Sequence, residues 1–539
     1  MRLPCSTRSR RTMTIPRQFV RALPSANLIG RRQLTTQSRR TVAQFLDWKP
    51  DTEVQNVVVN GYVRSVRNMK TEQFVNIGDG STRTPLQAMV SRSQDESSNL
   101  RVGAAVRLRG SWVPSKTDGQ THELKVDNVE VLGPSDAKTF PIQKKYQTPE
   151  FLRTMPHLRP RIPLYANILR LRSEAVATLT QFFASRDFIQ THPPIITSSD
   201  CEGAGEVFNV TTGPAETSSP APHSRNKKTE LFFRSPKYLT VSSQLHLEAL
   251  AQSLGHVWTL SPTFRAEQSD TTRHMSEFYM LEAEMSFVDD LDDVMDLVED
   301  MLRGLVTGLS GTRAARELRH RRAQGKTRTA EDDLVPIEEV ERRWKGIMQN
   351  PSSRWPRITY SEAIKLLQAE GDRFEIKPTW EGGLHSEHEK FLAKSLGVTN
   401  EAGAYMPVFV THYPREIKAF YMRTSASSNL EPDEAGATVD CFDLLVPDLC
   451  EIAGGSMREH RLKELLETME ARGMIPPSNG KEASNVDGNL DWYVDLRRWG
   501  SNPHGGFGLG FDRLLSYLVG VPNVRDVVAF PRWFGRCDC

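Results

Sequence analysis

The densest group of residue types suited to chemistry lies between Ser261 and Phe287, in the string SPTFRAEQSDTTRHMSEFYMLEAEMSF. Arg265 and Glu267 fall on a predicted strand, a polar loop follows, and the return strand carries three more candidates: Arg273, His274 and Phe278. A strand–loop–strand hairpin can aim all of these from one face of a sheet. A guanidinium offers a fork of donors to a phosphate, a carboxylate accepts from an exocyclic amine, and a ring covers a nucleobase. The segment therefore predicts a nucleotide site without a P-loop.

A second arginine with glycines before it lies near the C-terminus, in GGFGLGFDRLLSYL from Gly505 to Leu518. Glycines let the backbone approach a ligand closely, and Arg513 at the start of a predicted helix can reach a phosphate. No βαβ pattern precedes the glycines and no acidic residue follows at the dinucleotide spacing, so the segment does not predict a Rossmann site. Arg513 is therefore a second candidate for binding phosphate.

Two predicted domains and a linker must position these residues. Between Val54 and Leu132, short alternating runs such as VVVNGYVRSVR and HELKVDNVEVL predict five strands. Such strands fit a small closed β-barrel at residues 47–135, with a β-sandwich as the alternative. A Pro-, Lys- and Arg-rich hinge follows at 136–163. Residues 164–539 begin with a helix at Leu164–Arg186 and then mix strands and helices irregularly, which predicts an α+β domain built on antiparallel strands.

Two stretches of this second domain look inserted, near residues 211–229 and 311–345. The first is rich in Ser, Pro and Thr, which is typical of a mobile loop. The second is dominated by Arg, Glu and Ala from Gly311 to Asp333, and it predicts either a charged helix pair or a disordered excursion. The sequence indicates no function for either stretch.

The N-terminal stretch differs in charge from the rest. Met1 to Leu46 contain ten arginines and no Asp or Glu, whereas the whole chain of 539 residues has a net charge of only +2. A basic, acid-free N-terminus with Ser and Thr is typical of a mitochondrial transit peptide, so a transit peptide and a disordered arm are expected at 1–46. A basic arm that binds nucleic acid is the alternative. No run of eighteen apolar residues is present, so we predict no membrane span.

Several strings, in order along the chain, carry a family resemblance: DCEGAGEVF, TVSSQLHLEA, PTFRAE, TRHMSEF, KAFYMR, EIAGGSMRE and PHGGFGLGFDRL. Together with FIQTHPPIIT at Phe188–Thr197, the segments around Arg265 and Arg513 resemble motifs 1, 2 and 3 of class II aminoacyl-tRNA synthetases. The full set resembles the asparaginyl members of the aspartyl/asparaginyl subgroup, from about Val54 to Pro531. The resemblance implies a six-stranded antiparallel sheet flanked by helices in the catalytic domain, a homodimer formed through motif 1, and an OB-fold barrel that reads the anticodon.

The resemblance also implies how ATP is bound. By motif position, Arg265 holds the α-phosphate, and Arg513 holds the γ-phosphate from the opposite side. Phe278 stacks on adenine, with Glu267 near the adenine amino group. The predicted ATP site is completed by two more residues: Arg273 and His274. Two alternatives stay open, since Phe278 can be a core residue and His274 can serve to brace the hairpin.

Two carboxylates, Asp443 and Glu451, resemble those that hold Mg²⁺ against the phosphates, and hard oxygen ligands suit that ion. The alternative is that they only accept hydrogen bonds from neighbouring strands. One departure lies beside them, because the family usually has Pro-Gly-x-Gly-Glu-Ile where this chain has PDLCEI. Asp448 and Cys450 replace the two glycines. This replacement puts the local backbone, and with it the Mg²⁺ geometry at Glu451, in question.

The pocket beside ATP decides which amino acid is used. In the aspartyl enzymes, a segment of the form SPQLYKQ supplies a lysine that pairs with the carboxylate of the substrate's side chain. The matching segment here, Ser242–Glu248, has Leu247 at that position. An unpaired buried carboxylate would cost about 3–5 kcal/mol, so asparagine is expected, with a mitochondrial aspartyl-tRNA synthetase as the alternative. Carried over by resemblance, Arg458 reaches the side-chain oxygen and Glu282 accepts from the amide nitrogen or the α-amino group. Two further residues are placed at the α-amino end: Glu202 and Gln244.

In the barrel, Phe74 and Gln87 match positions that stack on and hydrogen-bond the central anticodon base, and Glu123 is a third candidate. Stacking and edge hydrogen bonds are how single-stranded RNA is read, although Phe74 can also be a barrel core residue. The resemblance thus implies ATP-dependent activation of asparagine and its transfer to the 3′ end of tRNA(Asn) in the mitochondrial matrix. An inactive paralogue would have lost residues such as Arg265 and Asp443, and a paralogue that synthesises asparagine would lack the barrel.

Overall fold

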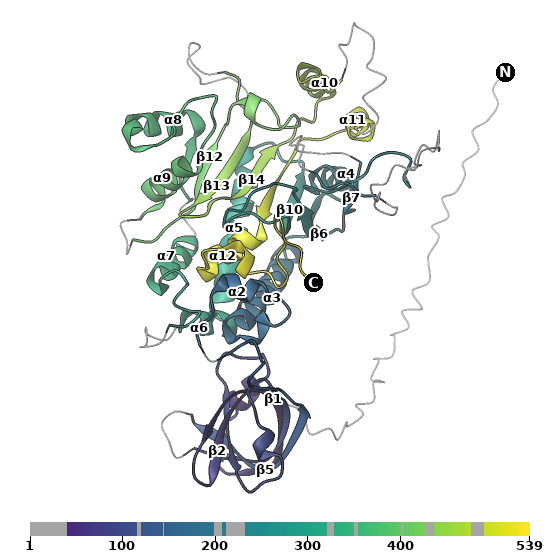
Figure 1. Ribbon diagram of the computed structural model, residues 1–539. Helices are drawn as coiled ribbons and strands as arrows, with labels where there is room; N and C mark the ends of the chain where they lie inside the picture. Colours follow the sequence, from purple (N-terminus) through teal and green to yellow (C-terminus); the bar gives the residue numbers. More distant parts are fainter. Residues whose placement is uncertain are drawn as a thin grey trace, which may run out of the picture.

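The computed structural model describes residues 40–115, 120–143, 145–198, 207–211, 232–320, 328–349, 354–399, 403–425, 436–475 and 490–539. Figure 1 shows a small barrel at one end of the molecule and a larger domain of sheet and helices above it. The predicted loop at 211–229 lies almost wholly outside the described residues.

The alternating sequence of the first domain forms a closed five-stranded barrel in the order β1-β2-β3-β5-β4, which confirms the barrel prediction over the sandwich. The strands are β1 (Val54–Asn68), β2 (Glu72–Gly78), β3 (Leu86–Ser91), β4 (Ala105–Pro114) and β5 (His122–Gly133). Every second side chain along β2 points inward, and Val75 and Ile77 are fully buried. This alternation leaves the side chains between them on the outer surface of the barrel.

A short helix, α1 (Val42–Asp47), precedes the barrel and packs onto it. Its start is fixed by a capping box, in which Gln44 N donates to Thr41 Oγ1 at 3.2 Å and Thr41 N donates to the Gln44 side chain at 2.8 Å. Phe45 is 2% exposed, and its ring centroid lies 5.5 Å from that of Trp112 in β4. The prediction of a disordered arm therefore does not hold for residues 42–46. A helix of six residues is too short for hydrophobic periodicity to reveal.

The larger domain is built on an eight-stranded sheet. Its strands are, in order across the sheet, β11 (Arg357–Thr359), β12 (Val408–Thr411), β13 (Cys441–Val446), β14 (Cys450–Met457), β15 (His504–Gly510), β10 (Glu277–Ser286), β9 (His256–Phe264) and β6 (Ile189–Gln190). The six central strands are antiparallel, as expected, whereas β11 and β6 add a parallel pair at each edge. The strand β6 lies within the segment Phe188–Thr197, which was read as a strand after a helix, whereas β11 was not foreseen, because three residues are too few to show alternation.

Helices surround this sheet, as Figure 1 shows. The long helix α3 (Pro163–Ala184) confirms the predicted helix at 164–186. It contacts α5 (Leu291–Ser310), whose buried side chains include Val294, Val298 and Leu305 and which in turn contacts β14 and β15. The remaining elements are α2 (Pro149–Arg153), α4 (Gln244–Leu254), α8 (Tyr360–Ala369), α9 (Ser386–Gly397), α10 (Leu462–Ala471), α11 (Asp491–Arg498), α12 (Phe511–Val519) and the hairpin of β7 (Ile196–Thr197) and β8 (Tyr238–Leu239).

The charged stretch at 311–345 is helical on both sides of residues 321–327, which are not described. It forms α6 (Arg313–Arg319) and α7 (Ile337–Met348). Ala314, Leu318, Trp344 and Ile347 from these helices are buried in the core of the larger domain. Of the two alternatives, a charged helix pair is therefore the one that agrees with the described residues.

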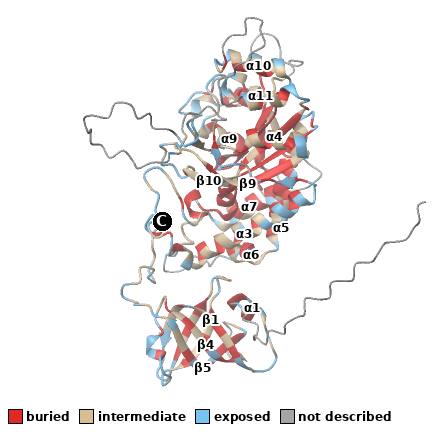
Figure 2. Cartoon of the chain, turned by 90° about the vertical axis from the view of Figure 1, so that its right-hand side faces the viewer, coloured by how far each residue is buried: buried red, intermediate tan, exposed pale blue. Residues whose placement is uncertain are grey.

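The barrel and the larger domain have separate hydrophobic cores. The core of the barrel gathers residues from α1 to β5, and the main core of the larger domain gathers residues from Leu152 onward. No buried residue belongs to both, and Figure 2 shows the buried positions as two separate groups. Within the described ranges, no helix is long and apolar enough to cross a membrane.

Candidate active site

The hairpin predicted around Arg265 is formed by β9 and β10, which pair from Phe264↔Glu277 to His256↔Met285. Arg265 lies just beyond the end of β9 rather than on it, although its N–H still donates to Ser276 O at 3.0 Å. The other polar candidates lie in the connecting loop, and only Phe278 is on a strand. The strand assignment for Arg265 and Glu267 was therefore wrong by one to three residues. The pairing of β9 with β10 ends at Phe264, so the polar residues that follow belong to the connecting loop.

A cavity of 130 Å³ at this hairpin collects all six residues predicted to bind ATP: Arg265, Glu267, Arg273, His274, Phe278 and Arg513. The two arginines come from opposite sides, one from the hairpin and one from the first turn of α12. Arg265 lies over the ring of Phe278, with its guanidinium carbon 5.6 Å from the ring centroid. Arg513 Nη1 donates to Glu451 O at 3.0 Å. Two guanidinium groups facing one small cavity form a strong anion site.

Two side chains of this cavity, Phe278 and His274, also pack against or hydrogen-bond the surrounding protein. Phe278 is half-buried and packs against the main core while it lines the cavity. His274 contacts the Thr271 hydroxyl through Nδ1, and its Nε2 lies 3.5 Å from Glu267 Oε2. Burial lowers the pKa of His274, so the ring is neutral at pH 7. His274 therefore braces the loop and also faces the cavity.

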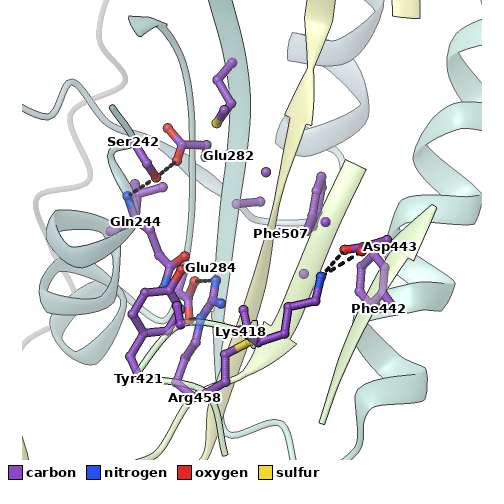
Figure 3. A pocket seen from close by; sticks show the side chains of 18 of the residues that line it. Ser242, Gln244, Glu282, Glu284, Lys418, Tyr421, Phe442, Asp443, Arg458 and Phe507 are labelled. Carbon is purple, nitrogen blue, oxygen red and sulfur yellow. Dashed lines mark hydrogen bonds and ion pairs between the residues drawn. The ribbon is translucent and has the colours of Figure 1, made fainter. Parts of the chain in front are cut away.

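A second cavity, of 340 Å³, adjoins the first and shares Arg265, Met280, Glu451 and Gly508 with it. Four of the residues predicted to bind the amino acid line it: Gln244, Leu247, Glu282 and Arg458. Figure 3 labels three of them: Gln244 of α4, Glu282 of β10, and Arg458, which directly follows β14. Glu202, the fifth, lies outside the described residues.

Arg458 is almost fully buried and is held by Glu284. Its Nε donates to Glu284 Oε1 at 3.1 Å, and its Nη2 donates to Glu284 Oε2 at 2.9 Å. Glu284 was missed in the sequence, although a signal was present. Glu282 and Glu284 are two residues apart on β10, so both side chains point to the same face of the sheet. Opposite Glu284, a Cβ at Gly506 would lie only 2.1 Å from Oε2, so only glycine fits there.

Glu248 on α4 accepts hydrogen bonds from a second group of buried side chains. Arg497 Nη2 donates to its Oε2 at 2.6 Å, and the Tyr493 hydroxyl donates to the same oxygen at 2.7 Å. His504 Nε2 lies 3.2 Å from that oxygen. Burial alone would raise the pKa of Glu248, but Arg497 and His504 bring it well below its usual range, so the carboxylate stays ionised. Gln244 Nε2 donates to Glu248 Oε1 at 3.1 Å, which links this cluster to the cavity.

Leu247 presents an apolar wall to the cavity. It is 1% exposed and packs with Ala251 and Val257. A lysine does line the cavity, but from the other side. Lys418 Nζ donates to both oxygens of Asp443, at 2.9 and 2.7 Å, as Figure 3 shows. Burial alone would lower the pKa of Lys418, whereas Asp443 raises it above its usual value, so this ammonium is charged and already paired.

Asp443 and Glu451 converge where β13 and β14 lie beside the two cavities. A Cβ at Gly454 would lie 3.2 Å from Glu451 Oε1 and 3.3 Å from Asp443 Oδ1, so glycine leaves the space between the two carboxylates open. Burial, and then the charge of Asp443, raise the pKa of Glu451. The described residues contain no cluster of three or more metal-binding side chains. Two carboxylates with open space between them fit an Mg²⁺ ion whose other ligands are phosphate oxygens and water.

The turn before Glu451 places two non-glycine residues in a backbone conformation that favours glycine. Asp448 has φ +69° and Cys450 has φ +63°, both in the left-handed region. Such a conformation costs a non-glycine residue about 1–2 kcal/mol. Asp448 is held by Arg343 Nη2 at 2.9 Å and Lys394 Nζ at 3.0 Å. Ion pairs from Asp448 to α7 and α9 therefore hold the turn that precedes Glu451.

The barrel candidates lie together on one outer face. Phe74 is half-buried and stands outside the core of the barrel, because its neighbours Gln73 and Val75 occupy the inward positions of β2. Gln87 on β3 is in register with Asn76, two residues along β2 on the same face. Gln87 Nε2 donates to Glu123 Oε2 on β5 at 3.2 Å. An aromatic ring thus stands beside an amide and a carboxylate, which suits a splayed-out base.

Comparison with protein families agrees with this arrangement. Residues 148–534 match the model of class II tRNA synthetases (D, K and N), and residues 57–132 match the OB-fold nucleic acid binding domain. The chain is 38% identical to the mitochondrial asparagine–tRNA ligase of Saccharomyces cerevisiae, over 92% of this chain and 96% of that protein. It is 41% identical to the asparagine–tRNA ligase of Nitratidesulfovibrio vulgaris (strain DP4), over 92% of this chain and 99% of that protein.

Among solved structures, the chain resembles the asparaginyl-tRNA synthetase of Pyrococcus horikoshii complexed with asparaginyl-adenylate. The TM-score is 0.73 at 26% identity, and the match covers 93% of this chain and 99% of the other. An aspartyl-tRNA synthetase from Entamoeba histolytica shares the fold, with a TM-score of 0.65 at 19% identity. The chain belongs to the class II aminoacyl-tRNA synthetases, in the asparagine–tRNA ligase family.

Proposed function

We propose that this protein activates asparagine with ATP and transfers the asparaginyl group to tRNA(Asn). In the first step the α-carboxylate of asparagine attacks the α-phosphorus of ATP, and pyrophosphate leaves. In the second step the 3′-hydroxyl of the terminal ribose attacks the carbonyl carbon of asparaginyl-adenylate, and AMP leaves. The observation that carries the proposal is that Arg265 and Arg513 face one cavity, which opens into a second cavity with Arg458 and Leu247 in its wall.

Positioning and charge neutralisation supply the catalysis. Arg265 lines both cavities, so it can hold the α-phosphate at the point where the carboxylate must attack. Arg513 neutralises the far end of the triphosphate, and Phe278 covers adenine. Groups fixed in advance need no reorganisation during the reaction, and they are worth most in a site closed to water. Asp443 and Glu451 would hold Mg²⁺, which when bound neutralises the charge on the phosphate oxygens.

Asparagine is favoured over aspartate because Arg458 and Lys418, which line the pocket, already have carboxylate partners. Glu284 and Glu248 hold Arg458 and Arg497, and Asp443 holds Lys418. A substrate carboxylate would therefore be an additional negative charge beside an apolar leucine. A carboxamide brings no charge, and its oxygen can still accept from Arg458.

The barrel is proposed to read the anticodon of tRNA(Asn) through Phe74, Gln87 and Glu123. A homodimer is proposed through the segment after α3, where Ile189, Ile195 and Ile196 are 40–44% exposed in the single chain. An apolar surface of this kind suits a subunit interface. Sedimentation velocity at micromolar concentration measures the assembly, and a monomeric mass would refute the dimer.

A mitochondrial location is supported by the acid-free, arginine-rich N-terminus and by two relatives named as mitochondrial, from Saccharomyces cerevisiae and Schizosaccharomyces pombe. Residues 1–39 would be the targeting part, and α1 would remain with the barrel. Import of the labelled full chain into isolated mitochondria should give a shortened, protease-protected product. A full-length product that stays accessible to protease would argue for the nucleic-acid-binding arm instead.

Arg265→Ala should lower asparagine-dependent ATP–pyrophosphate exchange by at least about 10²–10³-fold, because a positioned donor to the reacting phosphate is lost. The circular dichroism spectrum should stay unchanged. Arg354→Ala is the matched control, since Arg354 is 57% exposed and forms surface ion pairs with Asp292 and Asp296. Arg354→Ala should show the wild-type rate of ATP–pyrophosphate exchange. Normal exchange in Arg265→Ala would remove this residue from the reaction.

Leu247→Lys should lower kcat/KM for asparagine in the exchange assay by about 10²-fold and give measurable exchange with aspartate. The new ammonium would face the pocket, where it cannot form an ion pair with the neutral amide of asparagine but can form one with the carboxylate of aspartate. Leu254→Lys places the same group at the exposed end of α4 and should change neither value. Wild-type exchange that is faster with aspartate than with asparagine would reverse the choice of substrate.

Phe74→Ala should raise the KM for tRNA in aminoacylation by about tenfold, because base stacking on an aromatic ring contributes roughly 1–3 kcal/mol. Pyrophosphate exchange without tRNA should be unaffected, since the residue lies in the other domain. Phe74→Tyr keeps the ring and should retain the wild-type KM. If Phe74→Ala loses exchange as well, its role is structural.

A further inference from the structure

The described parts of the charged segment, residues 311–320 and 328–333, lie between the two domains, and the sequence indicated no function for them. Figures 1 and 2 show α6 at the end of the larger domain that faces the barrel. Glu317 on α6 is the centre of this contact, and its side chain is 13% exposed. It accepts from two groups of the β2–β3 loop in the barrel, the Thr82 hydroxyl and Arg83 N, the latter at 2.9 Å. It also accepts from Arg170 Nη2 on α3 at 2.8 Å. One carboxylate thus joins the barrel to two helices of the larger domain.

Other polar contacts surround Glu317. The guanidinium of Arg83 donates to the main-chain oxygen of Glu317 and to the carboxylate of Glu331. Arg313 pairs with Asp47 at the end of α1. The linker between the domains is held as well, because the Tyr146 hydroxyl donates to Asp333 at 2.7–2.9 Å. The described parts of the segment therefore contact the barrel, α1 and the linker.

These contacts matter because, within the described residues, no hydrophobic core continues from the barrel into the larger domain. The two hydrophobic cores share no residue. A cavity of 620 Å³ lies at the same junction, bounded by Tyr62 of the barrel, Phe140 and Arg161 of the linker, and Arg328 of the charged segment. Packing around a cavity of this size gives little resistance to rotation of the barrel relative to the larger domain. Partly buried ion pairs with directional hydrogen bonds then set the angle between the domains.

We propose that residues 311–320 and 328–333 form an interdomain latch in which Glu317 is the positioning residue. The latch fixes the distance and angle between the anticodon face of the barrel and the catalytic cavities, so that one tRNA can reach both. This inference rests on the proposed function and extends it. Glu317 touches neither ATP nor asparagine, and loss of its charge should act on tRNA alone.

The test compares Glu317→Gln with Glu338→Gln. The second is the same chemical change at an exposed position at the start of α7. We expect Glu317→Gln to raise the KM for tRNA about tenfold. One tRNA must contact the barrel and the catalytic cavities at the same time, so a small shift of one domain misplaces the tRNA at the other. Pyrophosphate exchange should stay at the wild-type level, and amide hydrogen exchange in residues 79–84 should become faster. Glu338→Gln should match the wild type in all three measurements.

Unchanged tRNA KM and unchanged amide exchange in Glu317→Gln would overturn the latch. A wild-type protein that fails to charge tRNA would instead overturn the proposed function. If Glu317→Gln also loses pyrophosphate exchange, Arg83→Ala decides, because this residue belongs to the barrel and, within the described residues, its hydrogen bonds to the larger domain go to the latch residues Glu317 and Glu331. A raised tRNA KM in Arg83→Ala with normal pyrophosphate exchange supports the latch, and an unchanged KM refutes it.

Discussion

Arg458 and Arg497 are two guanidinium groups with almost no exposed surface, and Glu284 and Glu248 hold both of them beneath the amino-acid cavity. Removing one member of such a set would leave a buried charge without a partner, which costs several kcal/mol. Three of the four residues come from α4, α11 and β10, and Arg458 directly follows β14, so the ion pairs also fix how these elements meet. The orientation of Arg458 in the wall of the cavity depends on this cluster.

Most of the residues that line the ATP cavity could be predicted from the sequence, because they lie in short local motifs. Arg265, Phe278 and Arg513 lie in short strings with recognisable spacing, and the structure brings all three to one cavity. Glu248 and Arg497 could not be paired in this way. They are 249 positions apart, and no pattern in either segment indicates the other. The same holds for Lys418, whose role becomes visible only when Asp443 lies beside it.

The departures from expectation also have physical causes. The edge strand β11 pairs over three residues, which is below the length at which alternation can be read. The turn at Asp448 and Cys450 lacks glycine, so its sequence does not indicate positive φ angles. Here tertiary contacts from Arg343 and Lys394 override the local preference. Composition suggested that the segment at 311–345 was inserted, whereas α6 and α7 contribute buried side chains to the main core.

The separation of the two hydrophobic cores has a consequence for how such a protein can change over time. A substitution that repacks the interior of the barrel does not alter the packing around the adenylation chemistry, because no apolar side chain is shared. Under the proposed function, the anticodon and the amino acid are therefore recognised in regions that can mutate independently. A lineage can drift in one recognition property while selection preserves the other, provided that the relative placement of the two regions is kept.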